Sequence, residues 1–135
     1  SNLRSDTIVQ AERKRVKANA IYYEGAESGC GLGYMNAVPN ARNMVAAGSI
    51  NCGTTAMRHE FGHNMGLDHG DASRGGSSVY AKGYSLMGTI MGGNSIPFYS
   101  TPKLYDSNLG MPIGIENKID AVRAMNERSN AVAAF

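Results

Sequence analysis

Residues 58–70 read RHEFGHNMGLDHG and contain every histidine of the chain, His59, His63 and His69. Residues four apart in a helix lie on one side of it, one turn apart, so the first two imidazoles can reach a single metal ion. Gly66 can adopt a left-handed conformation at little steric cost, which would end the helix and turn the chain back. The stretch therefore predicts a helix followed by a sharp turn, with His69 as the third metal ligand.

The same stretch predicts how such a site would react. Three neutral imidazoles suit one Zn²⁺ ion per chain and leave a fourth position for water, whose pKa falls to about 7. Glu60 stands about 100° round the helix from His59. We therefore expect Glu60 to reach that water rather than the ion, and to act as general base and then as acid in amide hydrolysis. The alternative, a chance HExxH in an ordinary helix, is disfavoured by the longer HExxHxxGxxH spacing.

Composition and charge fit one globular domain over residues 1–135. The chain has 42% hydrophobic residues and a formal net charge of +2, which gives no electrostatic case for nucleic acid or a membrane surface as partner. The basic cluster at 13–17 is better explained by a solvated helix face than by a binding patch. No stretch approaches the roughly 18 apolar residues of a membrane span, and the first residues do not resemble a signal peptide. Two origins stay open, a cytosolic protein and a mature or trimmed fragment of an exported one.

Hydrophobic periodicity and turn signals predict an α+β fold. We expect helices at 7–17, 54–65 and 115–133, and strands at 19–23, 32–38 and 44–50. In the last helix a common face, expected to be buried, consists of Ile119, Val122, Met125 and Ser129. From 67 to 104 the sequence favours loops. The two cysteines, Cys30 and Cys52, can form one disulfide, although their spacing alone does not establish the bond.

The stretch HEFGHNMGLDH resembles the zinc signature of the metzincin metalloendopeptidases, because it matches each fixed position of HExxHxxGxxH. The resemblance implies a zinc-dependent endopeptidase acting on proteins or peptides. It also implies a small twisted mixed sheet, a zinc helix, a C-terminal helix and a methionine turn beneath the metal. Met91, in GTIMGG and 22 positions after His69, is the expected turn residue, whereas Met87 is expected to be an ordinary packing residue.

Two further segments resemble the walls of the metzincin cleft. SGCGLGYM resembles the edge strand to which an extended substrate adds by main-chain hydrogen bonds. The segment after the methionine turn would line the pocket for the side chain that follows the cut. The substrate-binding candidates are therefore Gly31, Leu32, Gly33, Tyr34, Ser95, Ile96, Pro97, Phe98 and Tyr99.

The C-terminal part resembles bacterial secreted metzincins near the peptidyl-Asp metalloendopeptidase and reprolysin-like groups. In these relatives a cysteine in a CG edge strand often pairs with one shortly before the zinc helix, which matches Cys30 and Cys52. The resemblance therefore implies an extracellular bacterial enzyme with one disulfide.

The chain also departs from the family pattern. Only 58 residues precede His59, so the N-terminal part of the usual sheet is expected to be absent. The chain is either a minimal domain or the later portion of a larger or nicked one, which a further N-terminal segment or a propeptide would accompany. Gly70 follows the third histidine, where the metzincin subfamilies usually have other residues, so the subfamily stays open. Gly93 stands two residues after Met91, where some subfamilies have a tyrosine that acts as a switchable metal ligand, so such a ligand is disfavoured. Arg58 is either a solvated surface residue or a cationic substrate contact.

Two other functions compete with this prediction. The first is a metal-holding binding or structural module that lacks turnover because its sheet is incomplete. Glu60 disfavours it, since a binding site does not need that carboxylate. The second is a cytosolic zinc hydrolase of small peptides, which the edge strand and the cysteine pair disfavour. Cleavage of a protein substrate, with and without a chelator, would separate the three.

Overall fold

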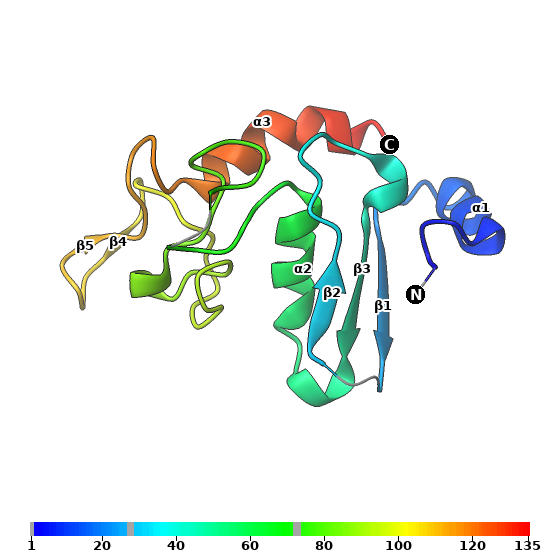
Figure 1. The fold of residues 1–135 in the computed structure, drawn as a ribbon, viewed down its shortest axis with the longest axis horizontal. Helices are drawn as coiled ribbons and strands as arrows, with labels where there is room; N and C mark the ends of the chain where they lie inside the picture. Colours follow the sequence, from blue (N-terminus) through cyan, green and yellow to red (C-terminus); the bar gives the residue numbers. More distant parts are fainter. Residues whose placement is uncertain (1, 27–28, 72–73) are drawn as a thin grey trace.

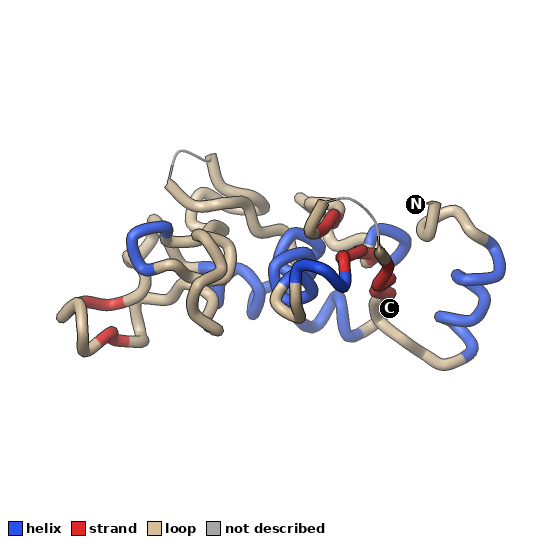
Figure 2. The backbone as a smooth tube through the Cα atoms, turned by 90° about the horizontal axis from the view of Figure 1, so that it is seen from below, coloured by secondary structure: helices blue, strands red, loops and turns tan. Residues whose placement is uncertain are grey.

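The computed structural model describes residues 2–26, 29–71 and 74–135 and has the expected α+β architecture (Figure 1). Its helices and strands are, in chain order, α1 (Thr7–Arg15), β1 (Ile21–Gly25), β2 (Gly31–Gly33), β3 (Val45–Ser49), α2 (Ala56–Asn64), β4 (Tyr105–Asp106), β5 (Met111–Pro112) and α3 (Ala121–Ala133). Short 3₁₀ turns lie at Ala41–Asn43, Ile50–Cys52 and Ser85–Met87. From residue 67 to residue 104 the chain is mostly loop, as predicted, and Figure 2 shows how much of the molecule is loop. None of the helices in the described part of the chain is long and apolar enough to cross a bilayer.

The larger sheet is small and mixed, with strand order β1-β3-β2. β1 runs parallel to β3, and β2 pairs with β3 in antiparallel register, with Leu32 opposite Ala47. Successive side chains in a strand point to opposite faces. One face lies against α2, where the Tyr22 ring meets the Phe61 ring edge-on at 5.8 Å between centroids. A hollow of about 430 Å³ lies on the other face, lined in part by Leu3 and Leu32. The sheet therefore presents β2, an edge strand, beside the helix that carries two histidines (Figure 1).

α2 ends as the sequence predicts, although it begins two residues later than expected. Gly66 has φ +86° and its N–H donates to the His63 carbonyl at 2.8 Å. The N–H of Leu67 donates to the Gly62 carbonyl at 2.9 Å. This pair of bonds is a Schellman motif, in which a glycine takes the left-handed position and the next apolar residue packs back on the helix. Leu67 is fully buried, so the turn is held by the core as well as by hydrogen bonds.

The core beneath this turn joins α3 to the loops that follow α2. Its main cluster contains Leu67, Ala81, Ile90, Met91, Ala121 and Ala124. A second cluster contains Tyr84, Met87, Ile113 and Ile119, so Met87 is the packing residue that was predicted. α3 runs across the top of the view in Figure 1, beyond the end of α2, and packs on the loops that follow α2.

The predicted strand at 32–38 is wrong in length, because only Gly31–Gly33 pairs with β3. Beyond it, side chains take the main-chain groups that a longer strand would use. The Asn64 amide donates to the carbonyls of Tyr34 and Val45 at 3.0 and 3.1 Å, and the Asn36 amide donates to the Asn43 and Asn64 carbonyls at 3.2 and 3.0 Å. Both asparagines are buried. The chain therefore leaves the sheet at Tyr34.

The strand predicted at 19–23 lies instead at Ile21–Gly25. Asn19 does not join the sheet, because its amide donates to the Val132 and Ala133 carbonyls at the end of α3. The predicted first helix ends at Arg15 rather than Lys17, whose φ of +57° is left-handed.

The basic cluster at 13–17 is only partly solvated. Arg13 is buried and its guanidinium donates to the Ala18 carbonyl at 3.1 Å, whereas Lys14, Arg15 and Lys17 are exposed.

The last helix begins at Ala121 rather than Ile115, because Asp120 caps it by accepting from the Arg123 N–H at 3.1 Å. The predicted buried face is right only in part. Ile119 is buried and Met125 packs against the main core cluster, but Ser129 is exposed. The buried positions of α3 itself are Ala121, Ala124 and Arg128. A buried arginine on that face is not anticipated by a pattern of apolar residues.

Candidate metal centre

The structure brings the three histidines together. His59 and His63 lie one turn apart on α2, and His69 returns to them after the turn at Gly66. The Nε2 atom of His69 is 3.2 Å from the Nε2 atoms of both His59 and His63. Nitrogens bound to one tetrahedral zinc at about 2.0–2.1 Å would lie roughly 3.3 Å apart. The spacing of the three side chains therefore fits one metal ion.

The other ring nitrogens fix the tautomers of two of these imidazoles. The Nδ1 atom of His59 is 2.8 Å from the Ile90 carbonyl oxygen, and that of His63 is 2.8 Å from the Leu67 carbonyl oxygen. A carbonyl oxygen only accepts, so each Nδ1 carries the proton and each Nε2 presents a lone pair. Burial also lowers the pKa of His63, which favours its neutral form. Lone pairs that point at one another repel unless a cation lies between them. Imidazole nitrogens that converge in this way are typical ligands of a metal ion.

Glu60 lies beside this group, between α2 and the edge strand. It is 8% exposed, and an ideal Cβ placed on Gly31 would come within 2.6 Å of its Oε1 atom. Burial raises the pKa of the Glu60 carboxyl, and the neighbouring His59 opposes that shift. Among the described residues, the group of ligand atoms that lie within 4.8 Å of one another contains the three histidines and not Glu60, whose carboxylate lies on the β2 side of the helix.

Met91 is buried and packs against α2 at Gly62. It is 1% exposed, and its sulfur lies where a side chain on Gly62 would be. Gly62 stands between the two histidines of α2, so the thioether packs against the helix at the level of the site. The Met91 carbonyl also accepts from the Gly70 N–H at 3.2 Å, directly after His69.

The segment that follows Met91 is tied to the start of α2. The Arg58 guanidinium donates to the Asn94 side-chain and main-chain oxygens at 2.6 and 3.1 Å, and the Asn94 amide donates to the Thr55 carbonyl at 3.0 Å. Arg58 is therefore not the solvated surface residue of the first alternative, since it is half-buried and bonded within the chain. Asn94 is not predicted from the sequence. Its φ of +58° matches the turn signal of the GGNS run.

The five candidates of the predicted pocket wall lie in this segment with different exposures. Ser95, Pro97 and Phe98 are exposed and Ile96 is half-buried. Tyr99 is half-buried, and its hydroxyl donates to the Arg58 carbonyl. Burial raises the pKa of Tyr99 to about 12. The segment thus borders the helix of the histidines on the side opposite the sheet.

The edge-strand candidates lie on the other side of α2. Leu32 is 72% exposed and points away from the helix, whereas the positions of Gly31 and Gly33 face Glu60. Tyr34 follows the strand, and its ring lies 5.1 Å from the Arg4 guanidinium carbon. Within the described residues β2 has a single partner strand, so its outer edge is unpaired.

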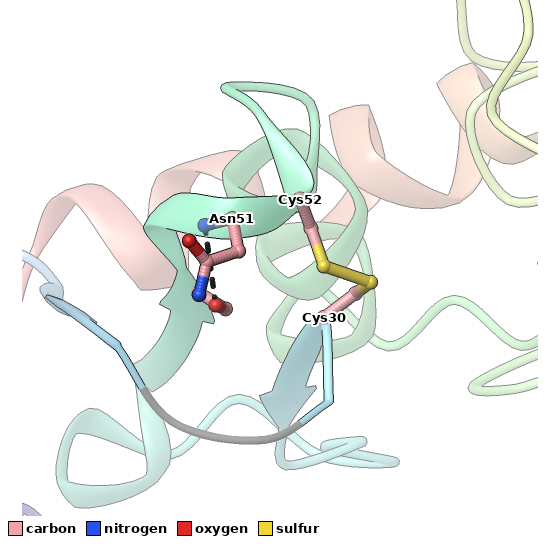
Figure 3. The surroundings of a disulfide bond; sticks show 4 residues. Cys30, Asn51 and Cys52 are labelled. Atoms are coloured by element: carbon pink, nitrogen blue, oxygen red, sulfur yellow. Dashed lines mark hydrogen bonds between the residues drawn. A yellow bond between two sulfur atoms is a disulfide. The ribbon is translucent and has the colours of Figure 1, made fainter.

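The two cysteines are joined by a disulfide with a Cα–Cα distance of 5.3 Å (Figure 3). The bond ties the residue before β2 to the 3₁₀ turn after β3. Asn51, in that turn, donates its N–H to the Ser49 hydroxyl at 3.2 Å. The bond thus anchors the start of the edge strand near the start of α2.

Arg128 is a second residue that the sequence does not predict. Its guanidinium donates to the carbonyls of Asn36 and Met65 at 2.6 and 3.1 Å, and also to that of Ala37. It lies where a side chain on Gly66 would be. Arg128 thus holds the end of the histidine helix and the loop after β2 to α3. The only local signal is its place seven residues after Ala121, on the buried face.

Three comparisons bear on this site. Residues 7–70, which include all three histidines, match the family described as reprolysin-like metallo-peptidases of family M12B. The chain is 30% identical to a peptidyl-Asp metalloendopeptidase of Pseudomonas aeruginosa, over 78% of this chain and 23% of that protein. It also superimposes on a chain from a solved chaperone–substrate complex with a TM-score of 0.82 and 43% identity, over 97% of this chain and 23% of that one.

The chain spans less than a quarter of the length of these two relatives. The family match covers the helix, the turn and the third histidine that the geometry selects, and both the resemblance in sequence and the α+β fold agree with it. This chain is therefore related to the metzincin-type, reprolysin-like metallopeptidases.

Proposed function

We propose that this chain is the catalytic part of a zinc-dependent endopeptidase, with His59, His63 and His69 as the metal ligands. The observation that supports this most directly is the convergence of three Nε2 atoms, two of them kept unprotonated by carbonyl partners on Nδ1. Three imidazoles without a thiolate or carboxylate are the ligand set of a catalytic zinc with an open position. One zinc per chain is expected.

Glu60 is the proposed general base and acid. A zinc ion bound here would polarise the scissile carbonyl and lower the pKa of its water towards 7. Glu60 would take a proton from the attacking water at a carboxylate oxygen and deliver it to the leaving amide nitrogen. Burial raises the pKa of Glu60, which brings the carboxyl closer to the range in which it both accepts and releases a proton.

Met91 is the proposed methionine turn, because it packs against Gly62 beneath the histidines while Met87 lies in a separate cluster. It would act as a hydrophobic floor and not as a ligand. The unpaired edge of β2 would receive an extended substrate, with Gly31, Leu32, Gly33 and Tyr34 along it. Across the helix, Ser95 to Tyr99 would line the pocket beyond the cut.

The relatives support the substrate class. One of them is named a peptidyl-Asp metalloendopeptidase, which favours internal peptide bonds of proteins as the target. That relative is bacterial, and the disulfide favours an oxidising compartment, so we propose an extracellular bacterial enzyme. We propose residues 1–135 as a single catalytic domain of this enzyme.

The test is cleavage of a quenched protein substrate by the zinc-loaded chain. Turnover should disappear with a chelator and return when zinc is added back, and mass spectrometry should place the cuts inside the substrate. A chain that binds zinc without turnover would instead be a metal-holding module. Cleavage confined to di- and tripeptides would identify a hydrolase of small peptides.

A further inference from the structure

We propose that Gly31 is a positioning residue for Glu60, because the side chain it lacks would occupy the place of the carboxylate. An ideal Cβ on Gly31 would lie 2.6 Å from Oε1, 2.9 Å from Cγ and 3.0 Å from Cδ of Glu60. Real Cβ atoms essentially never approach other atoms within 3.0 Å, so one of the two groups would have to move. This inference rests on the proposed function, in which Glu60 carries the proton.

The restriction at Gly31 is steric and does not come from the backbone. Neither Gly31 nor Gly33 has φ in the left-handed region. An alanine could therefore adopt the strand conformation at either position. Alternation in the strand directs these two positions towards α2 and directs Leu32 away from it. The GLG sequence of β2 thus leaves two side-chain positions empty on the face that meets Glu60.

Packing against β2 is what holds the carboxylate. Glu60 is 8% exposed, yet among the described residues no hydrogen bond to its side-chain oxygens is found. A side chain without such bonds keeps its rotamer only through the atoms packed around it. The carboxylate occupies the space that a side chain at Gly31 would fill. A methyl group there would displace the carboxylate, either towards the substrate cleft or away from it.

The two glycines differ in what they meet, and this gives an internal control. The atoms nearest a Cβ on Gly31 are all beyond the Cβ of Glu60. The atom nearest a Cβ on Gly33 is the Glu60 main-chain oxygen, at 2.7 Å, followed by Oε2 at 3.1 Å and Cβ at 3.2 Å. Glu60→Ala therefore empties the space next to Gly31 but leaves the obstacle next to Gly33.

The first measurement is thermal unfolding of Gly31→Ala and Gly33→Ala, each in the wild-type chain and in Glu60→Ala. Forcing a methyl group into a packed site should lower Tm by roughly 5–10 °C for either glycine in the wild-type chain. In Glu60→Ala the cost at Gly31 should fall below about 2 °C, while the cost at Gly33 should persist. Leu32→Ala, on the opposite face, is the control for an alanine in this strand. Equal costs at Gly31 in both backgrounds would overturn the proposal.

The second measurement is the kinetics of zinc-loaded Gly31→Ala with its zinc content. A displacement of about 1 Å in a reacting group can cost roughly 10²-fold in rate. We expect kcat to fall about 10²-fold, KM to change less than about twofold, and one zinc to remain bound. If the Tm loss at Gly31 depends on Glu60 but kcat is unchanged, Gly31 is a packing residue only, and its positioning role is overturned. A wild-type chain without turnover would refute the proposed function, while the Tm coupling would still decide whether Gly31 seats Glu60.

Discussion

Replacement of Arg128 by methionine should be one of the most destabilising single changes in the chain. Methionine keeps most of the apolar length of the side chain but removes every donor. Arg128 is 8% exposed and donates to three carbonyls, those of Asn36, Ala37 and Met65. Hydrogen bonds from a charged group contribute about 1.5–3 kcal/mol each, and the losses are not additive. We expect the free energy of unfolding to fall by about 3–5 kcal/mol.

Thermal unfolding in the presence of excess zinc measures this directly. For 135 residues the entropy of unfolding is about 0.28 kcal/mol per degree, so the Tm of Arg128→Met should fall by about 10–18 °C. Arg123→Met on the same helix is the matched control. Arg123 pairs with Glu127 at 3.0 Å, with both side chains nearly half exposed. It also donates to the Asn117 side chain at 2.9 Å and lies 4.1 Å from the centre of the Tyr80 ring, and exposed contacts of these kinds contribute about 0–1 kcal/mol each. Equal losses for the two variants would refute the reasoning, because burial of the guanidinium would then carry no weight.

Three further changes have expected outcomes. Because burial raises the pKa of Tyr99 to about 12, folding favours its protonated form, so the free energy of unfolding of the wild type should fall between pH 10 and 12. Urea titrations at each pH should show a smaller fall for Tyr99→Phe, and equal falls for the two proteins would contradict this. Removal of the disulfide between Cys30 and Cys52 should lower the free energy of unfolding by about 3 kcal/mol. Thiol labelling of the denatured, unreduced protein should find no free thiol, and two labelled thiols would exclude the bond. Met91→Leu should cost less than about 1.5 kcal/mol and Met91→Ala about 2–5 kcal/mol in urea unfolding, because only the second leaves a cavity; similar losses would show that Met91 is not tightly packed.

The part of the site that the sequence predicts is the part that is local in the chain. The spacing of His59 and His63, the glycine at 66 and the return of His69 all lie within one helix and one turn. Helical geometry and the conformational freedom of glycine are enough to place them. For the same reason the end of α2 and most of β3 agree with the predicted boundaries.

The part that the sequence does not predict depends on partners distant in the chain. Nothing near residue 34 indicates that the Asn64 side chain will donate to the Tyr34 carbonyl and so end the strand. Nothing near residue 128 indicates that an arginine will be buried against the loop after β2. Arg58 likewise finds Asn94 only in the folded chain. Local periodicity reports which face of an element is apolar, but a polar side chain that satisfies remote carbonyls breaks the pattern.

Zinc content measured beside the rate of peptide cleavage, in Glu60→Ala and in His69→Ala, tests the central claim most directly. Glu60 is assigned to chemistry and His69 to the metal. Glu60→Ala should therefore keep about one zinc per chain while its rate falls by more than about 10²–10⁴-fold. His69→Ala should lose zinc affinity and activity together, and its Tm should no longer depend on added zinc. Loss of zinc from Glu60→Ala, with zinc and activity both retained in His69→Ala, would contradict the account.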